Sequence, residues 1–408
     1  MQNEGEKSCG APARVLLVSP QPFFQWRGSP LRVEANARVL AGRGYQVDLL
    51  TLPIGEDRTI PGVRIVRVPN RLGVRDVHIG PSLIKAAFDL LILVWGLCMA
   101  VRRRYDVVHG IEDGGFLGFF MSRLGGSALI FERHSDPASY RDGLLRNMVL
   151  WLYSRIERFT IRRADAVIGT GPGLVKQIEA VEGAGSVHHI FDIPSSNVTA
   201  TPAGTARARA AMAGSRDDLI VMFVGSFAGY QGVPLLLDAA VKALSAVPSA
   251  RLAVIGGTPE EIATLRAEMA ASDDVARRIM FLGRMPPEEI PHHLAAADVL
   301  VSPRLGGVNT PLKLLDYLKA GRAIVATDVP ANRHILDESV SILVPPTVEG
   351  LCDGLMRALK DPELRRRLGE AGQRLISEQY GFERFAQRLG ACYDQVLAMR
   401  KTLKHRGL

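Results

Sequence analysis

Short apolar runs alternate with helix-like segments along most of this chain. Between residues 13 and 171 the runs are ARVLLVSP, QVDLLTL, VRIVRVP, DVVHGI, ALIFERH and ADAVIGTG, and amphipathic segments such as LRVEANARVLAGRGY separate most of them. A second series begins at Leu219 with LIVMFVGSF and continues with ARLAVIGG, RIMFLGRM, ADVLVSPR, RAIVATDVP and VSILVPP. Strands that are apolar throughout and alternate with helices form parallel sheets covered on both faces. The sequence therefore predicts an α/β fold.

The two series are separated by a segment rich in Pro, Ser, Thr, Ala and Gly, between Asp192 and Asp217. This composition is typical of an interdomain linker, here with no more than one short helix. A chain of 408 residues can form two or three domains. We expect a Rossmann-like N-terminal domain over residues 1–195, a linker over 196–217, a second Rossmann-like domain over 218–375, and a C-terminal helix over 376–408 that packs back on the first domain.

Both predicted domains open with the same order of strand, loop, glycine and helix. The first contains VLLVSPQPFFQWRGSP and the second VMFVGSFAGYQGVP. In doubly wound sheets, ligands bind at the carboxyl ends of the strands, beside helix N-termini. Two such domains that face each other would enclose a ligand-binding cleft between them.

The charge and the cysteines limit the classes of partner. The net charge is +8 and the pI about 9.5. The basic residues form short groups, which favour solvated helix faces first, an anionic membrane second and nucleic acid last, because no RNA-binding signature or zinc finger is present. The four cysteines lie far apart without metal-ligand spacing, which predicts a reducing compartment, no disulfide framework and no zinc site.

One segment, LIKAAFDLLILVWGLCMAVRRR from Leu83 to Arg104, is nearly long enough to span a bilayer. Lys85 and Asp89 interrupt it, and each is costly in hydrocarbon. A buried or half-buried helix, a helix with one face on a membrane, and a true span remain open, in that order of preference. The opening residues MQNEGEKSCGAPA lack the basic-then-apolar order of a signal peptide.

The stretch GGVNTPLKLLDYLKAG contains a flexible glycine loop followed by a helix that we expect to begin near Thr310-Pro311. The free N–H groups of that turn suit a pyrophosphate. Lys313 on the first turn can pair with phosphates, and Asp316 on the same side can accept hydrogen bonds from ribose hydroxyls. The alternative is a well-capped helix with a surface lysine.

The longer stretch FLGRMPPEEIPHHLAAADVLVSPRLGGVNTPLKLLDYLKAGRAIVATDVP resembles the retaining glycosyltransferases of family 4, which have the GT-B fold. The segments FVGSFAGYQGVPLLLDAA, VIGGTPEE, DVVHGIEDGG, RRADAVIGTGPGLVKQI and SPQPFFQWRGSP extend the resemblance over most of the chain in matching order. The resemblance implies two facing Rossmann-like domains with a cleft between them, and transfer of a sugar from a nucleoside diphosphate donor with retention of configuration.

The resemblance also implies roles for residues of the second domain. Asp316 matches the second acid of the family's paired-glutamate motif, which contacts the ribose. The donor-binding positions implied or proposed in this domain are Gly225, Ser226, Gln231, Arg284, Arg304, Asn309, Thr310, Pro311 and Leu312. Backbone amides of residues 309–312, with Lys313 as a catalytic group, would stabilise the leaving diphosphate.

The sequence departs from the family pattern at two places. Val308 stands where the first acid, which touches the sugar hydroxyls, is expected, so the identity of the donor sugar is open. Ser226 and Gln231 stand where many members have an arginine and a lysine that neutralise the diphosphate. A buried diphosphate needs compensating charge, for which Lys313 and Arg304 are the nearest candidates. We interpret NTPLK as a variant form of the motif.

In the first domain, His134 follows a predicted strand, and the resemblance implies that it reaches the donor sugar or the acceptor as a catalytic residue. His109, Glu112 and Asp113 are acceptor-side candidates, although the two acids could simply cap the next helix. Gly28 matches the glycine that lets the backbone approach the diphosphate, and Arg27 beside it adds charge.

The sequence as a whole favours a metal-independent hexosyl- or related glycosyltransferase of cell-surface polysaccharide or glycolipid synthesis. No Asp-x-Asp motif ends a strand, so we expect no metal and no cofactor besides the nucleotide-sugar co-substrate. The apolar helix at 83–101, the arginines at 102–104 and WLYSRIERFTIRR favour a glycan or lipid-linked acceptor, with the protein cytoplasmic or peripheral on the inner face of the plasma membrane. The alternatives are a GT-B nucleotide-sugar epimerase and a non-catalytic sugar-nucleotide or glycan-binding scaffold.

Overall fold

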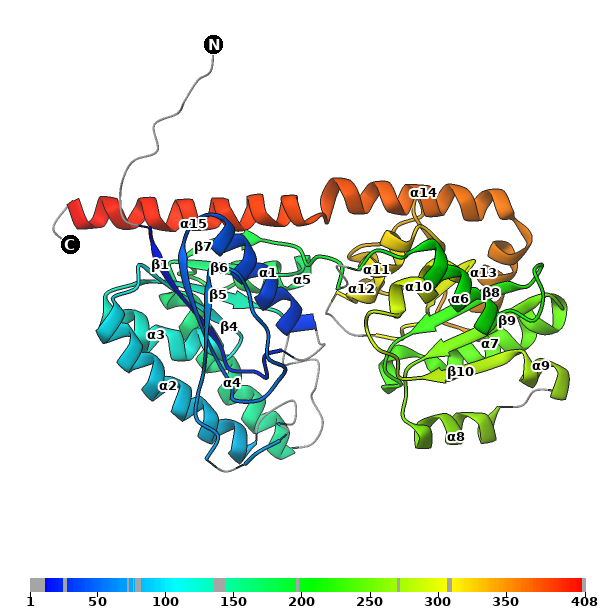
Figure 1. Ribbon diagram of the computed structural model, residues 1–408, viewed down its shortest axis with the longest axis horizontal. Coiled ribbons are helices and arrows are strands. Elements are labelled where there is room, and N and C mark those ends of the chain that lie inside the picture. Colours follow the sequence, from blue (N-terminus) through cyan, green and yellow to red (C-terminus); the bar gives the residue numbers. More distant parts are fainter. Residues whose placement is uncertain are drawn as a thin grey trace, which may run out of the picture. The chain divides into compact units, whose positions relative to one another are not determined.

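The computed structural model describes residues 12–24, 28–71, 73–75, 77, 82–135, 144–195, 198–269, 272–306 and 310–405. The chain forms two compact units. The first contains residues 1–191 and 385–408, and the second contains residues 192–384. Each unit is an α/β domain with one parallel sheet, as the alternation of apolar runs and helices predicts (Figure 1).

The first unit has a seven-stranded sheet in the order β3-β2-β1-β4-β5-β6-β7, and all the neighbouring strands are parallel. The strands are β1 (Arg14–Ser19), β2 (Gln46–Thr51), β3 (Val63–Arg67), β4 (Val107–Ile111), β5 (Ala128–Arg133), β6 (Ala166–Gly169) and β7 (Ser186–His189). The helices are α1 (Gly28–Gly42), α2 (Leu83–Arg103), α3 (Gly114–Gly125), α4 (Leu144–Arg163), α5 (Pro172–Glu179) and α15 (Phe382–His405).

Helices cover both faces of this sheet (Figure 1). On one face, α2, α3 and α4 enclose a core with side chains such as Leu16, Phe88 and Phe131. On the other face lie α1 and α15, and Arg43 at the end of α1 pairs with Asp394 of α15 at 2.7 Å. Continuous burial of β4 and β5 follows from this double cover.

The second unit has a six-stranded parallel sheet in the order β10-β9-β8-β11-β12-β13. The strands are β8 (Leu219–Val224), β9 (Ala250–Ile255), β10 (Ile279–Gly283), β11 (Val299–Ser302), β12 (Ala323–Thr327) and β13 (Ile342–Val344). The helices are α6 (Pro202–Met212), α7 (Val233–Ala246), α8 (Pro259–Glu268), α9 (Asp273–Arg277), α10 (Ile290–Ala296), α11 (Lys313–Ala320), α12 (Pro330–Arg333), α13 (Val348–Lys360) and α14 (Pro362–Gln379), with the short 3-10 helix η2 (Gly229–Gln231).

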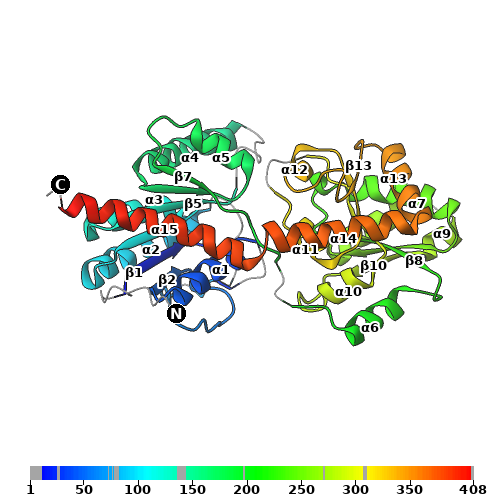
Figure 2. The ribbon, with the colours of Figure 1, turned by 90° about the horizontal axis from the view of Figure 1, so that it is seen from above.

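The unit boundaries differ from the expected linker and C-terminal helix. The segment expected to be a linker forms α6, which begins at a Thr201 cap and lies beside α10 in the second unit (Figure 2). Arg209 of α6 bonds the Ala296 carbonyl at 2.8 Å and the Asp298 carboxylate at 2.6 Å, so this segment is part of the domain. At the other end, α14 lies beside α11 in the second unit, and the chain from residue 385 onward belongs to the first.

Candidate functional site

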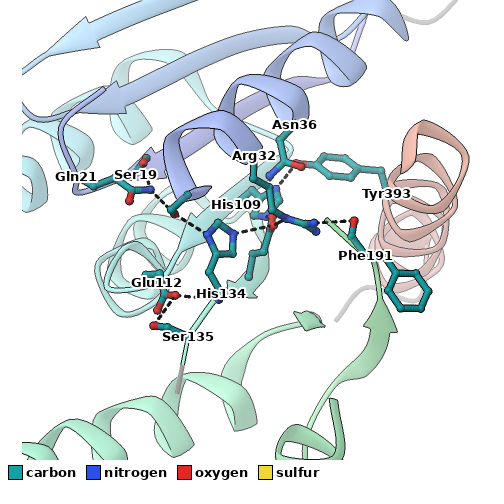
Figure 3. A network of polar contacts seen from close by, with 12 residues as sticks. Ser19, Gln21, Arg32, Asn36, His109, Glu112, His134, Ser135, Phe191 and Tyr393 are labelled. Carbon is teal, nitrogen blue, oxygen red and sulfur yellow. Dashed lines mark hydrogen bonds and ion pairs between the residues drawn. The ribbon is translucent and has the colours of Figure 1, made fainter. Parts of the chain in front are cut away.

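The strand order of the first unit creates a switch point between β1 and β4, where the connections leave in opposite directions. At the carboxyl ends of these strands, Ser19 is the last residue of β1 and Gln21 follows it, while Glu112 and Asp113 follow β4. Gly28, the predicted diphosphate glycine, is the first residue of α1. His134 follows the neighbouring strand β5, so the topology brings these residues to one edge of the sheet. Figure 3 shows Ser19, Gln21, Glu112 and His134 at this edge.

Both ring nitrogens of His134 contact protein groups. Nδ1 lies 2.6 Å from the Ser29 hydroxyl, and Nε2 lies 2.9 Å from a carboxylate oxygen of Glu132. The main-chain N–H of His134 donates to Glu112 Oε1 at 2.9 Å. Only 10% of the His134 side chain is exposed. The ring therefore has a fixed orientation before any substrate is present.

His109 does not lie where an acceptor-side residue must be. Its side chain is completely buried, with Nε2 at 2.9 Å from Glu132 and Nδ1 at 2.9 Å from the Tyr393 hydroxyl of α15. A fully buried imidazole cannot touch an acceptor, so the prediction for His109 is wrong. The position of β4 explains this, because its side chains are covered on both faces of the sheet.

Glu112 and Asp113 form the turn after β4. Glu112 has a positive φ of 52°, which a residue other than glycine rarely adopts and which is common at functional sites. Burial raises the pKa of the Glu112 carboxyl. The nearby His134 and the hydrogen bond from Ser135 lower this pKa but do not cancel the effect of burial. Asp113 does not cap α3 with its side chain; instead it accepts from Lys85 of α2 at 2.8 Å and from the Tyr153 hydroxyl of α4. The turn is thus attached to both helices.

In the second unit the switch point lies between β8 and β11, and Lys313 is placed there. It is the first residue of α11, and its Nζ donates to Gln231 Oε1 at 2.9 Å and lies 4.2 Å from the centre of the Phe223 ring. A Cβ at Gly225 would lie 3.4 Å from the same Nζ. Burial, with a smaller contribution from Arg304, lowers the pKa of Lys313 to about 7.

The loop after β8 contacts Lys313 through Gln231. Gln231, which replaces a basic residue of the family, accepts a hydrogen bond from Lys313, so the cation reaches this loop from α11 instead. Ser226 is exposed. Gly256, at φ 125°, passes so close that a Cβ would lie 1.9 Å from the Gly225 carbonyl. Position 256 therefore has no room for a side chain.

The remaining predicted donor residues fall into three places. Arg304 follows β11, is buried, and lies over the Tyr230 ring at 5.0 Å. Arg284 is exposed after β10, the edge strand, and is two strands away from β8. Asn309 and Val308 lie outside the described residues, as does Arg27.

The start of α11 differs from the prediction. The helix begins at Lys313 with Leu312 as its N-cap, because residues 311–315 first form a turn in which Leu314 N–H donates to the Pro311 carbonyl. Thr310 does not cap the helix; its hydroxyl lies 3.4 Å from Nδ1 of His334. Asp316, expected to bind ribose, accepts a hydrogen bond from the Ser195 hydroxyl. Ser195, which sequence reasoning did not identify, therefore contacts the same carboxylate.

A broad exposed apolar surface lies on α2, α3 and α4 of the first unit. Within the described chain, α2 is the one helix long and apolar enough to cross a bilayer, by length and composition only. It is not buried on all sides: Phe88, Ile92 and Gly96 pack inward, while Trp95 is 41% exposed. The side chains that form this apolar surface are Leu83, Ile84, Leu90, Leu91, Val94, Trp95, Val101, Phe120, Leu124, Trp151, Leu152 and Phe159.

Arginines border the apolar surface. Arg155 lies over the Trp151 ring at 5.0 Å, Arg163 over Phe159 at 5.6 Å, and Arg123 over Phe119 at 5.5 Å. Arg102 and Arg103 form the last turn of α2. Among the described residues, no group of three or more His, Cys, Asp or Glu side chains is arranged to hold a metal ion.

Comparison with known proteins identifies the family. The model described as "Glycosyl transferase 4-like domain" matches residues 27–191, and "Glycosyl transferases group 1" matches residues 218–361. The alpha-D-kanosaminyltransferase of Streptomyces kanamyceticus is 26% identical over 90% of this chain and 99% of its own length. The phosphatidyl-myo-inositol mannosyltransferase of Mycobacterium tuberculosis is 29% identical over 94% of this chain and 97% of its own.

Solved structures share the fold of this chain. Sucrose-phosphate synthase from Thermosynechococcus elongatus superposes with a TM-score of 0.75 at 21% identity, covering 95% of this chain and 100% of that one. HepE of Anabaena, solved with UDP and glucose, gives a TM-score of 0.70 at 14% identity, covering 94% and 100%. Both relatives named above are glycosyltransferases, which favours the predicted transferase over an epimerase or a scaffold. The chain is therefore a glycosyltransferase with the GT-B fold and belongs to the group 1, family 4-like glycosyltransferases.

Proposed function

We propose that this enzyme transfers a sugar, with retention of configuration, from a nucleoside diphosphate donor to a glycan or lipid-linked acceptor at the inner face of the plasma membrane. The observation that carries the donor assignment is Lys313. Its ammonium lies at the switch point of the second unit, next to Arg304, and within the described chain no carboxylate pairs with it. A desolvated cation of this kind is suited to an anion, and a diphosphate supplies the missing charge.

The surrounding residues complete the donor site. The turn at 310–312 precedes α11, so its backbone N–H groups add positive potential beside Lys313. Asp316 would bind the ribose after exchange with Ser195. HepE, which shares the fold, is solved with UDP and glucose, and this supports a sugar nucleotide as donor. Since Lys313 and the helix terminus can compensate the leaving diphosphate, we propose a reaction that does not require a metal.

A donor panel tests this proposal. Purified protein is incubated with UDP-, GDP-, ADP- and dTDP-sugars and a membrane extract, with and without EDTA, and nucleoside diphosphate release is measured. We expect acceptor-dependent release with one donor, unchanged by EDTA, and a product whose anomeric configuration equals that of the donor by NMR. Tight nucleotide binding without release from any donor would contradict the proposal, as would an inverted product.

The apolar surface of α2, α3 and α4 supports a membrane-bound acceptor. Twelve exposed large apolar side chains on three neighbouring helices, bordered by arginines, match the interface of an anionic bilayer. Asp113 connects these helices to the turn after β4, because it accepts hydrogen bonds from both Lys85 of α2 and Tyr153 of α4. The neighbouring residue in that turn, Glu112, accepts from the His134 N–H. One of the relatives is named for transfer to phosphatidyl-myo-inositol, which is a lipid.

Vesicle binding is expected to depend on this surface. The wild-type protein should sediment with vesicles that contain anionic phosphatidylglycerol and much less with pure phosphatidylcholine. Trp95→Gln combined with Trp151→Gln should weaken binding by at least about 10-fold, because each large apolar side chain contributes roughly 1.5–3 kcal/mol when it leaves water. Phe382→Gln is the control, since Phe382 is 46% exposed but lies outside the surface. Equal sedimentation of the double variant and the control would disprove the assignment.

A further inference from the structure

Glu132 is a buried carboxylate to which none of the sequence motifs gives a role. It lies on β5 and is completely inaccessible to solvent. Figure 3 shows side chains from several elements pointing at this region. Oε1 accepts from Arg32 Nε and lies 2.9 Å from His134 Nε2. Oε2 accepts from Asn36 at 2.7 Å and lies 2.9 Å from His109 Nε2. Oε1 thus has two hydrogen-bond partners, while Oε2 accepts one hydrogen bond from Asn36 and is in close contact with His109.

This environment keeps Glu132 charged. Burial by itself would raise the pKa of the carboxyl, but Arg32, His109 and His134 together hold it well below its usual range. Arg32 is fixed in turn, because its Nη1 donates to the Phe191 carbonyl at 2.9 Å. A buried carboxylate with three hydrogen bonds and a close contact to His109 cannot rotate without losing several contacts, so its oxygens are fixed points in the fold.

The fixed carboxylate determines where the proton of His134 lies. An ionised carboxylate only accepts hydrogen bonds, so Nε2 must carry a proton. At the other nitrogen, Ser29 Oγ accepts from the Gln21 amide at 2.8 Å, which leaves the Ser29 proton to donate to Nδ1. Gln21 is itself held by Ser19 at 3.0 Å. The chain of donors runs in one direction and selects the neutral Nε2–H tautomer.

The same arrangement extends to the C-terminal helix. His109 presents Nε2 to the other oxygen of Glu132, and its Nδ1 lies 2.9 Å from the Tyr393 hydroxyl. Tyr393 is fully buried, and its ring stacks on Tyr45 at 5.8 Å. The last helix of the chain therefore contributes a hydroxyl to the network that holds His134.

We propose that Glu132 is a positioning residue for sugar transfer, which fixes His134 as the Nε2–H tautomer so that Nδ1 can accept a hydrogen bond from a sugar hydroxyl. The substrate hydroxyl takes the place of the Ser29 hydroxyl. His109 lies against the second oxygen of the carboxylate and is held in turn by the Tyr393 hydroxyl, which makes α15 part of the support. This proposal rests on the proposed role of His134 at the donor sugar or acceptor.

The first measurement uses the wild-type protein. Long-range proton–nitrogen NMR spectra with labelled histidine should show that the neutral imidazole of His134 carries its proton on Nε2. Ser29→Ala should leave the proton there, because Glu132 and not Ser29 selects the tautomer. A proton on Nδ1 in the wild-type protein overturns the proposal, whatever the variants do.

The second measurement uses kinetics. Glu132→Gln places an amide N–H against the donors, and we expect kcat to fall by about 10- to 100-fold, with the donor KM changed less than about 3-fold and a mixed His134 tautomer. Tyr393→Phe removes only a hydroxyl and should lower kcat by a smaller factor while the protein stays folded. Tyr45→Phe, a loss of the same group beside the same helix, is the matched control and should retain wild-type kcat.

The outcomes separate this inference from the proposed site. Wild-type kcat in folded Glu132→Gln, or in Tyr393→Phe if Glu132→Gln does not fold, overturns the positioning role. Full activity of His134→Ala would remove His134 from the reaction and overturn the positioning role with it, while the proposed sugar transfer would stand. Loss of activity in His134→Ala with full activity in Glu132→Gln leaves the site in place and disproves only the inference.

Discussion

Replacing Lys313 with methionine is expected to lower kcat/KM by about 100- to 1,000-fold, the typical cost of losing one donor to a developing anion. Methionine keeps most of the side-chain volume over the Phe223 ring, so the fold should be retained. Without the ammonium, the leaving diphosphate lacks the one cation on the first turn of α11. Steady-state kinetics with the donor identified by the panel measures this change.

Lys313 also predicts how donor binding depends on pH. Because its pKa in the free enzyme is about 7, the amine is charged below pH 7 and mostly neutral above it. A bound diphosphate favours the charged form, so above pH 7 the donor must bind together with a proton, and its affinity falls as the pH rises. Titration calorimetry at pH 8 in buffers of different ionisation enthalpy should show uptake of close to one proton in the wild type and about none in Lys313→Met.

Lys313 should also make the free energy of unfolding depend on pH, but this free energy rises with pH where the donor affinity falls. Between pH 7 and the ordinary lysine pKa of about 10.4, the unfolded chain binds more protons than the folded one, so stability rises with pH over this window. Lys313→Met should remove that rise. Lys242→Met is the control, since Lys242 is an exposed lysine of α7 paired with Glu349.

Wild-type kcat/KM in Lys313→Met would refute the diphosphate assignment.

The sequence predicted those features that depend on local pattern and topology. Continuous apolar runs identify the strands because both faces of a parallel sheet are buried, and strand ends at a switch point come together whatever the details of packing. Lys313 was proposed from the pattern of its own loop and helix, and His134 from its place at a strand end together with the family resemblance; both roles stay predictions. Ser226 and Gln231 were recognised as departures from the family, but only the fold shows that Gln231 holds Lys313.

The contacts that sequence reasoning missed join distant elements. Glu132 meets residues 100 and 96 positions earlier in the chain, Arg32 and Asn36, and Ser195 meets Asp316 across 121 positions. No periodicity encodes such pairs. One signal was present: a glutamate inside the apolar run ALIFERH is costly to bury unless it is paired. Helix α11 begins at Lys313 and not near Thr310. The carbonyls of Pro311 and Leu312 accept hydrogen bonds from Leu314 and Leu315, three residues later, and so form a turn before the helix.

Arg32→Met is expected to destabilise the first unit by about 3–5 kcal/mol at pH 7, because it leaves the buried Glu132 without its cation. The side chains of both partners are almost fully buried, at 3% and 0% exposure. Arg38→Met on the same helix is the matched control: Arg38 pairs with Glu34 but is 41% exposed, so its loss should cost no more than about 1 kcal/mol. Urea unfolding with an active-site-independent probe measures both variants.

The free energy of unfolding should depend on pH through Glu132. In the wild type the pKa of Glu132 lies well below its usual range, so its stabilisation is present above about pH 4.3 and is lost as the pH falls towards the folded-state pKa. In Arg32→Met the cation that lowers the pKa of Glu132 is absent, while burial still raises that pKa. The carboxyl therefore protonates more readily in the folded state. The difference in free energy of unfolding between Arg32→Met and the wild type should therefore become smaller as the pH falls from 7 to 5.

A double variant separates the charge from the packing. Arg32→Met combined with Glu132→Leu removes both buried charges and should be more stable than Arg32→Met alone, because burying an unpaired carboxylate costs more than replacing the pair with apolar groups. Its kcat should nevertheless stay low, since His134 loses the acceptor at Nε2. A double variant that is no more stable than Arg32→Met would show that lost packing, and not the uncompensated charge, causes the instability. Recovery of both stability and kcat would show that Glu132 serves the fold without directing His134.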